Sequence, residues 1–252
     1  MTDAERLARA FEGDGLISDL FARPADVASG YDLQDRVRGT LGRPIAGWKL
    51  AQTTPAAQKA AGIDAPTVSP LLEGMIVPAD TVFEPGRFYK PEAEAEIAIE
   101  LREAIEGPVG PQDVRAAAAG FRLAIEIADT RYMDKPTMGA PSVIADMNSC
   151  GALVIGPLED IAALDEAARA SVITRLGDGS IVATLPADMQ PNPLEVVAFL
   201  SRFASGRGHA LHAGCIITTG THTAPTRTEP GLLVAEFDGV GKVACRLSEP
   251  RG

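Results

Sequence analysis

The pattern of apolar and polar positions changes once along the chain, near residue 44. Before that point apolar residues recur at helical spacing, which predicts helices over Ala4–Phe11 and Tyr31–Leu41. After it come short apolar runs separated by Pro, Gly and Asp, a pattern typical of many short strands. The predicted strands cover residues 45–51, 81–84, 94–101, 121–128, 151–156, 180–185, 214–220, 232–237 and 242–247. The fold class we expect is α+β, with N-terminal helices beside a β-rich core.

Two further helices interrupt the strands. Residues 111–119 begin with a proline suited to a first helical turn, and residues Asn192–Glu195 combine an Asn cap, a first-turn proline and an acidic residue. The apolar positions that follow, 196, 199, 200 and 203, form one stripe that faces the core. Residues 232–247 are expected to form a hairpin that turns at Asp238-Gly239.

Residues 91–101 carry the clearest chemical signal. Read as a strand, they place alternate residues on one face: Glu92, Glu94, Glu96 and Glu100. Like charges on one face are destabilising unless a cation neutralises them. The same residues are good helix formers, so a solvated helix is the alternative, although Pro91 and the β-branched Ile97 and Ile99 favour the strand.

A third carboxylate follows about thirty residues later. Leu123, Ile125 and Ile127 share one face of the run at 121–128, and Glu126 points the opposite way. Two carboxylates spaced i, i+2 and a third from another strand make a plausible oxygen-ligand site for Mg²⁺ or Mn²⁺.

Composition limits the classes of partner. With 252 residues and 46% apolar residues, the chain is long enough for a full core, and we expect a single domain, 1–252, in which 1–43 is a helical lead-in and 44–252 a β-rich catalytic core. A net charge of −11 argues against nucleic acid and anionic membranes as partners. Three widely spaced cysteines, a polar and acidic N-terminus and the lack of a long apolar stretch lead us to expect a cytoplasmic protein.

Single residues offer weaker signals. Lys49 lies in an apolar run, where it either reaches the surface or occupies a pocket in which desolvation lowers its pKa. Thr219, Gly220 and Thr221 lie at the end of a predicted strand and either offer donors to an anion or form a plain turn. The spacing of His209, His212 and His222 matches no standard zinc site, so we expect surface or loop histidines. No serine-hydrolase elbow, P-loop or dinucleotide fingerprint is present.

Taken in order, six segments resemble the fumarylacetoacetate hydrolase superfamily, and within it the branch of 2-keto-4-pentenoate hydratases and 2-oxo-3-hexenedioate (4-oxalocrotonate) decarboxylases. The segments are G-W-K-L-A-Q-T, E-A-E-I-A, A-I-E-I-A-D-T-R, A-D-M-N-S-C-G-A-L-V-I-G, N-P-L-E-V-V-A-F-L and L-H-A-G-C-I-I-T-T-G. The resemblance runs from about residue 31 to 247 without large gaps. It implies a mixed β-sandwich or roll core like the C-terminal domain of that superfamily.

The resemblance also implies roles for individual residues. Glu94, Glu96 and Glu126 match the family's ligands for Mg²⁺ or Mn²⁺, and Lys49 matches a lysine near the metal that carries a proton or pairs with an oxyanion. A glutamate at 126, where the hydrolases have aspartate, resembles the hydratase and decarboxylase branch. Residues that fall where the family lines its substrate pocket are Gln52, Ser149, Thr219 and Gly220.

The expected activity is hydration of a 2-hydroxy-2,4-dienoate to a 4-hydroxy-2-oxo acid, as in the meta-cleavage catabolism of aromatic compounds. Decarboxylation of a 2-oxo-3-hexenedioate is the alternative, followed by an acylpyruvate-type C–C hydrolase and a non-catalytic family member. The chain has Thr67 where hydratases have an aspartate, and Asn148 is displaced by one position from the family pattern. The resemblance further implies a small 2-oxo acid as substrate and a homo-oligomer, in some relatives paired with another enzyme of the pathway.

Overall fold

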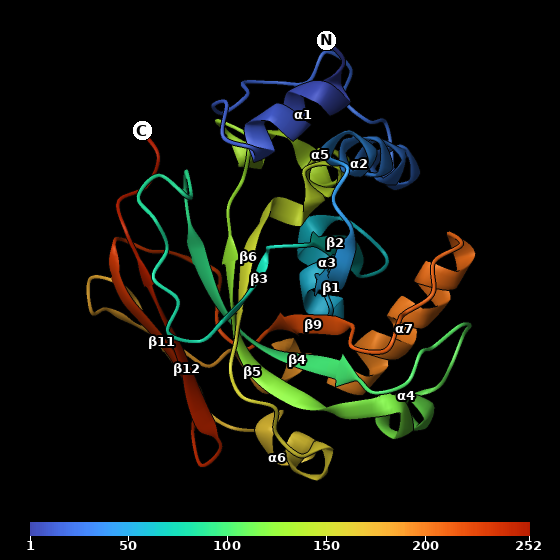
Figure 1. The fold of residues 1–252 in the computed structure, drawn as a ribbon, viewed down its shortest axis with the longest axis vertical. Coiled ribbons are helices and arrows are strands. Elements are labelled where there is room, and N and C mark those ends of the chain that lie inside the picture. Colours follow the sequence, from blue (N-terminus) through green and yellow to red (C-terminus); the bar gives the residue numbers. More distant parts are fainter.

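The larger of two sheets holds the centre of the molecule in the computed structural model, which describes residues 1–252. Its strand order is β2-β1-β9-β4-β5-β6-β3, with β10 beside β4. The strands are β1 (Ile45–Ala51), β2 (Thr67–Leu72), β3 (Ile76–Pro78), β4 (Glu92–Leu101), β5 (Ala118–Ala128), β6 (Cys150–Ile155), β9 (Ile216–Thr221) and β10 (Thr226–Arg227). Most pairs are antiparallel, but β1 with β9 and β3 with β6 are parallel. The sheet curls until β2 approaches β6, so the core is a roll (Figure 1).

The second sheet has four strands in the order β12-β11-β7-β8. They are β7 (Val172–Arg175), β8 (Ile181–Ala183), β11 (Gly231–Phe237) and β12 (Gly241–Leu247). Strand β12 packs on β5 and β6, and apolar side chains of both sheets form one buried cluster. The predicted hairpin is confirmed, because β11 and β12 pair along their whole length and Gly239 turns between them with a φ of +73°.

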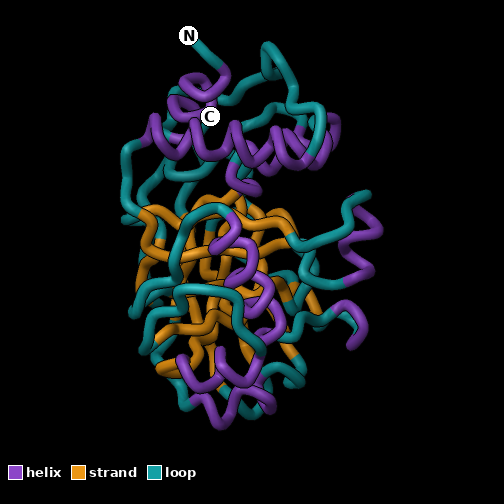
Figure 2. The backbone as a smooth tube through the Cα atoms, turned by 90° about the vertical axis from the view of Figure 1, so that its right-hand side faces the viewer, coloured by secondary structure: helices purple, strands orange, loops and turns teal.

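Helices cover one end and one side of the roll. They are α1 (Asp3–Phe11), α2 (Val27–Leu41), α3 (Pro55–Ala61), α4 (Pro111–Ala117), α5 (Gly139–Ala145), α6 (Leu164–Ala167) and α7 (Pro193–Gly206), with 3-10 turns η1 (Lys135–Thr137), η2 (Met147–Ser149), η3 (Ile161–Ala163) and η4 (Ala187–Met189). The first two helices pack with α5 as a layer above the strands (Figures 1 and 2). Thr2, Asp26 and Asn192 cap α1, α2 and α7 with their side chains, as the sequence predicts for α7.

Strand β4 separates two environments. Ala95, Ile97 and Ile99 enter the cluster between the sheets, whereas Ala98 joins a second cluster under the N-terminal helices. Because side chains alternate along a strand, Glu94 and Glu96 share the face of Ala98, inside the roll. The alternation predicted for this segment is confirmed, and the helical alternative is wrong.

The α+β fold and the roll are confirmed, but some elements differ from the prediction. Residues 81–84 form no strand, and only an isolated bridge joins Val82 to Arg246. Strand β2 and helices α3 and α5 were not predicted, because their sequences lack a clear apolar period. The burial of β2 and α5 comes from contacts distant in the chain, and no residue of α3 is buried.

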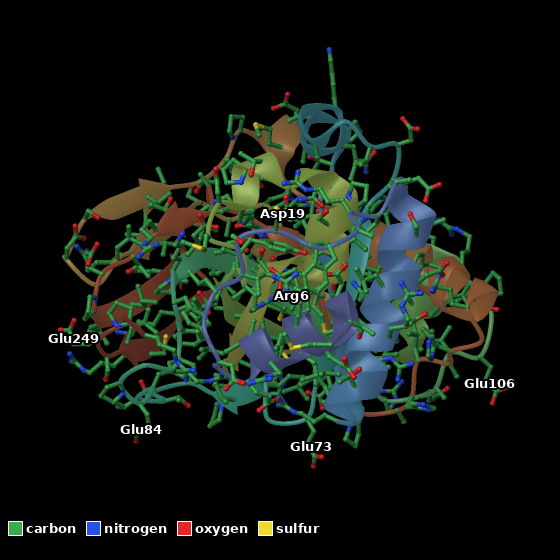
Figure 3. All side chains as sticks on the ribbon, turned by 90° about the horizontal axis from the view of Figure 1, so that it is seen from above. Arg6, Asp19, Glu73, Glu84, Glu106 and Glu249 are labelled. Atoms are coloured by element: carbon green, nitrogen blue, oxygen red, sulfur yellow. The ribbon has the colours of Figure 1, made fainter.

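The acidic surface fits the net charge of −11. Viewed from above, labelled carboxylates point outwards at the rim: Glu73, Glu84, Glu106 and Glu249 (Figure 3). No helix has both the length and the apolar character needed to cross a membrane.

Candidate active site

Three glutamates meet where β4 and β5 pair. Glu94 lies directly opposite Glu126 in the antiparallel register, and Glu96 follows two residues along on the same face. Together with Lys49 they line an inner cavity of about 290 Å³. The structure thus brings together the three predicted metal ligands and the predicted catalytic lysine.

Lys49 is buried on β1 rather than extended to the surface. Its Nζ donates hydrogen bonds to Oε1 of Glu126 and, at 3.0 Å, to the carbonyl oxygen of Asn148. Burial has the largest single effect and lowers the pKa of Lys49, but Glu126 together with Cys150 and Glu94 outweighs it, and the pKa is raised overall. The expectation that a pocket lowers the pKa of Lys49 is therefore wrong. The side chain is a protonated ammonium fixed by two hydrogen bonds, and it is suited to donate a hydrogen bond to an oxyanion.

The carboxylates repel one another in this setting. Burial, and then the charge of Glu126, raises the pKa of Glu94 to about 7 and that of Glu96 well above its usual value. Oε2 of Glu126 is buried without a hydrogen-bond partner. Oε2 of Glu96 accepts a hydrogen bond of 3.1 Å from the Gly220 amide. Excess negative charge and an unsatisfied oxygen are what a bound cation would relieve.

The donor set fits a hard divalent cation, since all three side chains offer carboxylate oxygens. In the structure these oxygens do not already converge as a coordination shell. Oε1 of Glu126 instead accepts a hydrogen bond from the Lys49 ammonium.

A strained turn closes one wall of the cavity. Met147, Asn148 and Ser149 have φ values of +50°, +49° and +58°, a region that residues with a Cβ rarely occupy. The buried ion pair of Arg131 with Asp146 holds the turn: Nε donates to Oδ1 over 2.6 Å, and another guanidinium nitrogen donates to the Asp146 carbonyl oxygen, also over 2.6 Å. The turn directs the Asn148 carbonyl to Lys49 and its side-chain amide to Ser69 Oγ, 2.9 Å away.

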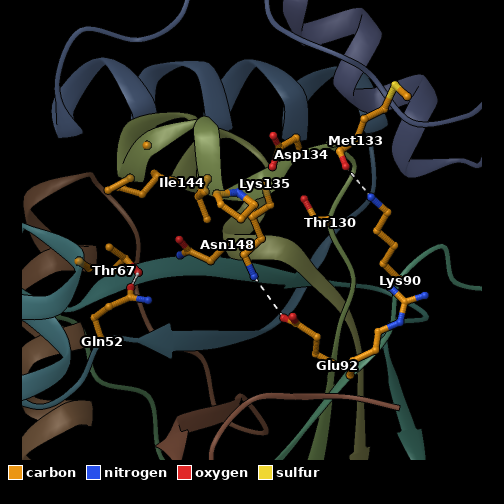
Figure 4. Close-up of a pocket in the computed structure, with 16 residues that line it drawn as sticks. Gln52, Thr67, Lys90, Glu92, Thr130, Met133, Asp134, Lys135, Ile144 and Asn148 are labelled. Carbon is orange, nitrogen blue, oxygen red and sulfur yellow. Dashed lines mark hydrogen bonds and ion pairs between the residues drawn. The ribbon is translucent and has the colours of Figure 1, made fainter. Parts of the chain in front are cut away.

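An outer cavity of about 600 Å³ adjoins the inner one and is drawn in Figure 4. The residues that line both are Gln52, Lys135, Val143 and Asn148. Three cations face the outer cavity: Lys90, Lys135 and Arg227. Lys135 pairs with Glu92 at 3.3 Å, and Lys90 donates to the Met133 carbonyl oxygen (Figure 4). Glu92 and Asp134 also line the outer cavity, so this end of the site has one more cation than carboxylates, whereas the inner end is rich in carboxylates.

The predicted substrate-binding residues fall into two groups. Gln52 and Gly220 line the inner cavity. Ser149 and Thr219 are buried outside the lining of both cavities, and the Thr219 hydroxyl donates to the Ile97 carbonyl oxygen. Their roles in binding stay predictions.

Gly220 has a φ of +102°, and the Thr53 hydroxyl fills the space that a Cβ would need. The backbone amide of residue 220 can therefore reach Glu96 only because this residue is glycine. Thr221, at the end of the same predicted strand, also lines the inner cavity. Asn148 and Lys135 line it too and were not predicted as site residues. The sequence signal for Asn148 was its place beside Ser149, and no local pattern marks Lys135.

The remaining notable residues lie elsewhere. Thr67 lines the outer cavity and its hydroxyl donates to Gln52 Oε1 over 2.5 Å. Glu100 pairs with Arg122 at 2.6 Å, away from the cavities. His222 lies in the loop directly after β9, which agrees with the expectation of a surface or loop histidine, but it is fully buried there with its ring against Phe237. All three cysteines are buried and free.

Comparison with known proteins shows the family of the chain. The model of the fumarylacetoacetate (FAA) hydrolase C-terminal domain matches residues 54–248. The chain belongs to this family.

Similar curated proteins carry two kinds of name. The 4-oxalocrotonate decarboxylase of Pseudomonas putida is 28% identical over 231 residues, which cover 87% of this chain and 85% of the relative. The 2-hydroxyhexa-2,4-dienoate hydratase of Comamonas testosteroni is 30% identical and covers 74% and 71%. The 2-keto-4-pentenoate hydratase of Burkholderia vietnamiensis is 28% identical and covers 89% and 87%.

A solved structure matches nearly the whole fold. The 4-oxalocrotonate decarboxylase from Pseudomonas putida G7, complexed with magnesium and adipate, has a TM-score of 0.83 and 25% identity, and the match covers 97% of each chain. The fumarylpyruvate hydrolase from Pseudomonas aeruginosa, in complex with Mn²⁺ and pyruvate, shares the fold with a TM-score of 0.62 at 19% identity, covering 82% of this chain and 91% of that one.

Proposed function

We propose that the chain is a divalent-metal-dependent lyase that acts on a small 2-oxo acid through its enolate. The observation that carries this proposal is the shared cavity of Glu94, Glu96, Glu126 and Lys49. Family relatives whose structures hold magnesium, calcium or manganese support the divalent cation. Which of these ions the chain uses is left to experiment.

The three glutamates would hold the cation, which would supply Lewis-acid polarisation of the substrate's 2-oxo group. The protein's own groups would do the rest. The Lys49 ammonium, fixed by Asn148, offers a hydrogen bond to the oxygen on which negative charge develops. The Gly220 amide holds Glu96 in place. Gln52 and Asn148, which line both cavities, are placed to orient the substrate's carbon chain.

Two reactions use such an enolate. In the predicted hydration, a 2-hydroxy-2,4-dienoate takes a proton at C5, and water then adds at C4 to give a 4-hydroxy-2-oxo acid. The related hydratases, up to 30% identical, support it. The inner cavity alone, about 290 Å³, is large enough for a five-carbon acid.

Decarboxylation is the second reaction, and the outer cavity favours it. A 2-oxo-3-hexenedioate has a second carboxylate, and Lys135, Lys90 and Arg227 offer positive charge where the distal end of such a chain would lie. The electron pair of the C5–C6 bond would move into the conjugated 2-oxo system as CO₂ leaves, and the oxygen would then take a proton. The basic outer end gives decarboxylation the stronger geometric support.

The test is a paired assay of the purified chain with Mg²⁺ or Mn²⁺. One reaction contains 2-hydroxypenta-2,4-dienoate and is followed by loss of the diene absorbance. The other contains 2-oxo-3-hexenedioate and is followed by CO₂ release. Release of CO₂ without hydration assigns the decarboxylase, and the reverse assigns the hydratase. No metal-dependent turnover of either substrate contradicts the proposed class.

A further inference from the structure

A second polar cavity lies apart from the active site, and no residue lines both it and either chamber of that site. Its volume is about 240 Å³, and we call it the arginine cavity. Its walls come from the end of α1, the segment before β4, the segment after β5, the start of β6 and the C-terminal residues. Its charged lining residues are Arg43, Arg87, Arg131, Arg251, Glu12 and Asp129.

The arginines outnumber the carboxylates, in a chain whose net charge is −11. Asp129 is buried and its oxygens accept hydrogen bonds from the backbone amides of Tyr89 and Lys90, at 2.7–3.0 Å. Glu12 is exposed and lies 3.6 Å from Arg43. Four guanidinium groups thus face two carboxylates, and the lining keeps an excess of positive charge.

Two of the four arginines are structural. Arg131 is committed to Asp146 and to the Cys150 carbonyl oxygen, 2.8 Å away. Arg251 donates to the carbonyl oxygens of Gly86 and Gly13, and a Cβ at residue 13 would overlap its guanidinium. Glycine at position 13 thus lets this cation close one side of the cavity.

Arg87 is different, because it forms no ion pair with any carboxylate of the chain. Its only hydrogen bond to the protein is a long one, 3.4 Å, to the Gly151 carbonyl oxygen. Burial, and then the charge of Arg43, lowers the pKa of Arg87, and the opposing charges of Asp129 and Glu12 do not make up for this, so the guanidinium is only partly compensated. A planar guanidinium with free N–H groups is well suited to bind an oxyanion through two parallel hydrogen bonds.

We propose that the arginine cavity binds a small multivalent oxyanion, with Arg87 as the principal ligand. Arg43, which donates to the Glu73 carbonyl oxygen and pairs with Glu12, supports it as a neighbouring positive charge. The volume admits a phosphate or a short dicarboxylate, which share the chemistry that the guanidinium groups recognise. This site is independent of the proposed lyase reaction, since Arg87 lines neither chamber of the active site.

The test is titration calorimetry of the full chain at low ionic strength with inorganic phosphate and, separately, with succinate. Sodium chloride at matched ionic strength is the control for screening. We expect one saturable site per chain, with a dissociation constant below about 1 mM for the preferred anion. Tighter phosphate binding assigns a phosphate-bearing ligand, and tighter succinate binding assigns a dicarboxylate.

Variants identify the site. Arg87→Gln should weaken binding of the preferred anion at least about tenfold. Arg36→Gln removes an exposed arginine of α2 and should leave binding unchanged. Melting temperatures measured without anion report whether each variant folds. If Arg87→Gln does not fold, Arg43→Gln is the second variant. Absence of saturable binding of either anion, or equal binding by wild type and a folded Arg87→Gln or Arg43→Gln variant, overturns the proposal.

Discussion

Glu126 lies directly across the β4–β5 pair from Glu94, and one of its oxygens accepts a hydrogen bond from Lys49 while the other has no partner. One buried carboxylate thus links the predicted cation ligands to the only buried lysine. This relationship makes the glutamate face of β4 a site rather than a solvated surface.

Replacing either opposed glutamate should abolish cation binding and turnover together. Glu94→Gln and Glu126→Gln each remove one charged ligand, so we expect a loss of about 100-fold or more in kcat/KM and in Mn²⁺ affinity. Calorimetry and the paired assay measure the two effects. Glu100→Gln is the matched control on the same strand, because Glu100 pairs with Arg122 outside the cavities. Unchanged Mn²⁺ affinity in both site variants would contradict the ligand assignment.

The Lys49–Glu126 pair should show strong coupling in the metal-free protein. Lys49→Met leaves a buried carboxylate without its cation, which costs about 3–5 kcal/mol of unfolding free energy. Lys49→Met with Glu126→Gln removes both charges and should recover much of that loss. Urea unfolding of the four proteins measures the coupling. Strictly additive single-variant effects would show that the two side chains do not depend on each other.

The turn at 147–149 should depend on its ion pair. Asp146→Asn leaves Arg131 buried and uncompensated, so we expect a loss of about 3–5 kcal/mol in stability. Since the turn fixes Asn148 and through it Lys49, kcat should fall in the fraction that remains folded. Asp165→Asn breaks the more exposed pair with Arg115 and should cost less than about 1 kcal/mol with no change in kcat. Equal effects of the two substitutions would argue against a positioning role.

The basic outer cavity should select for a second carboxylate. Arg227→Met should raise KM for 2-oxo-3-hexenedioate about tenfold and change KM for 2-hydroxypenta-2,4-dienoate much less, because Arg227 lines only the outer cavity and only the diacid reaches that end. Lys242→Met on β12, an exposed site, is the control. A similar change in KM for both substrates would show that the outer cavity does not select for the second carboxylate.

Buried His222 should make the fold sensitive to mild acid. Burial lowers its pKa to about 4, below the value of about 6.5 in the unfolded chain, so protons bind preferentially to the unfolded state. Its contribution to stability is present above about pH 6.5 and is lost as the pH falls toward 4, with about 2 kcal/mol lost by pH 5.

The measurement is urea unfolding at pH 7 and pH 5 for wild type and His222→Gln. The variant should lose less stability between the two pH values than wild type, by about the amount that His222 contributes. His212→Gln, at an exposed histidine, should behave as wild type. An identical pH dependence in wild type and His222→Gln would show that His222 does not titrate in this range.

Much of the fold could be predicted, because the alternation in β4 and β5 and the caps of α7 are local signals. The placement of Glu94 opposite Glu126 depends on the strand register, which the rest of the sheet determines. Local sequence does not give this register, and only the family resemblance indicated that the two residues belong to one site. Strand β2 was missed because its burial on both sides comes from β1 and from helices distant in sequence.

The electrostatics of the site could not be predicted from local sequence. The pKa of Lys49 is raised because Glu126, seventy-seven residues away, is its partner. Likewise the basic outer end joins Lys90, Lys135 and Arg227 from three separate segments, none of which forms a motif. Such groupings are set by tertiary packing alone.

The central claim is that a divalent cation held by the three glutamates drives lyase chemistry. The most direct test is turnover of 2-oxo-3-hexenedioate and 2-hydroxypenta-2,4-dienoate by chelator-stripped protein before and after addition of Mn²⁺. The account predicts negligible turnover of either substrate without metal, and recovery on one of them with Mn²⁺ in wild type but not in Glu126→Gln. Equal turnover with and without metal, or full recovery in Glu126→Gln, would contradict it.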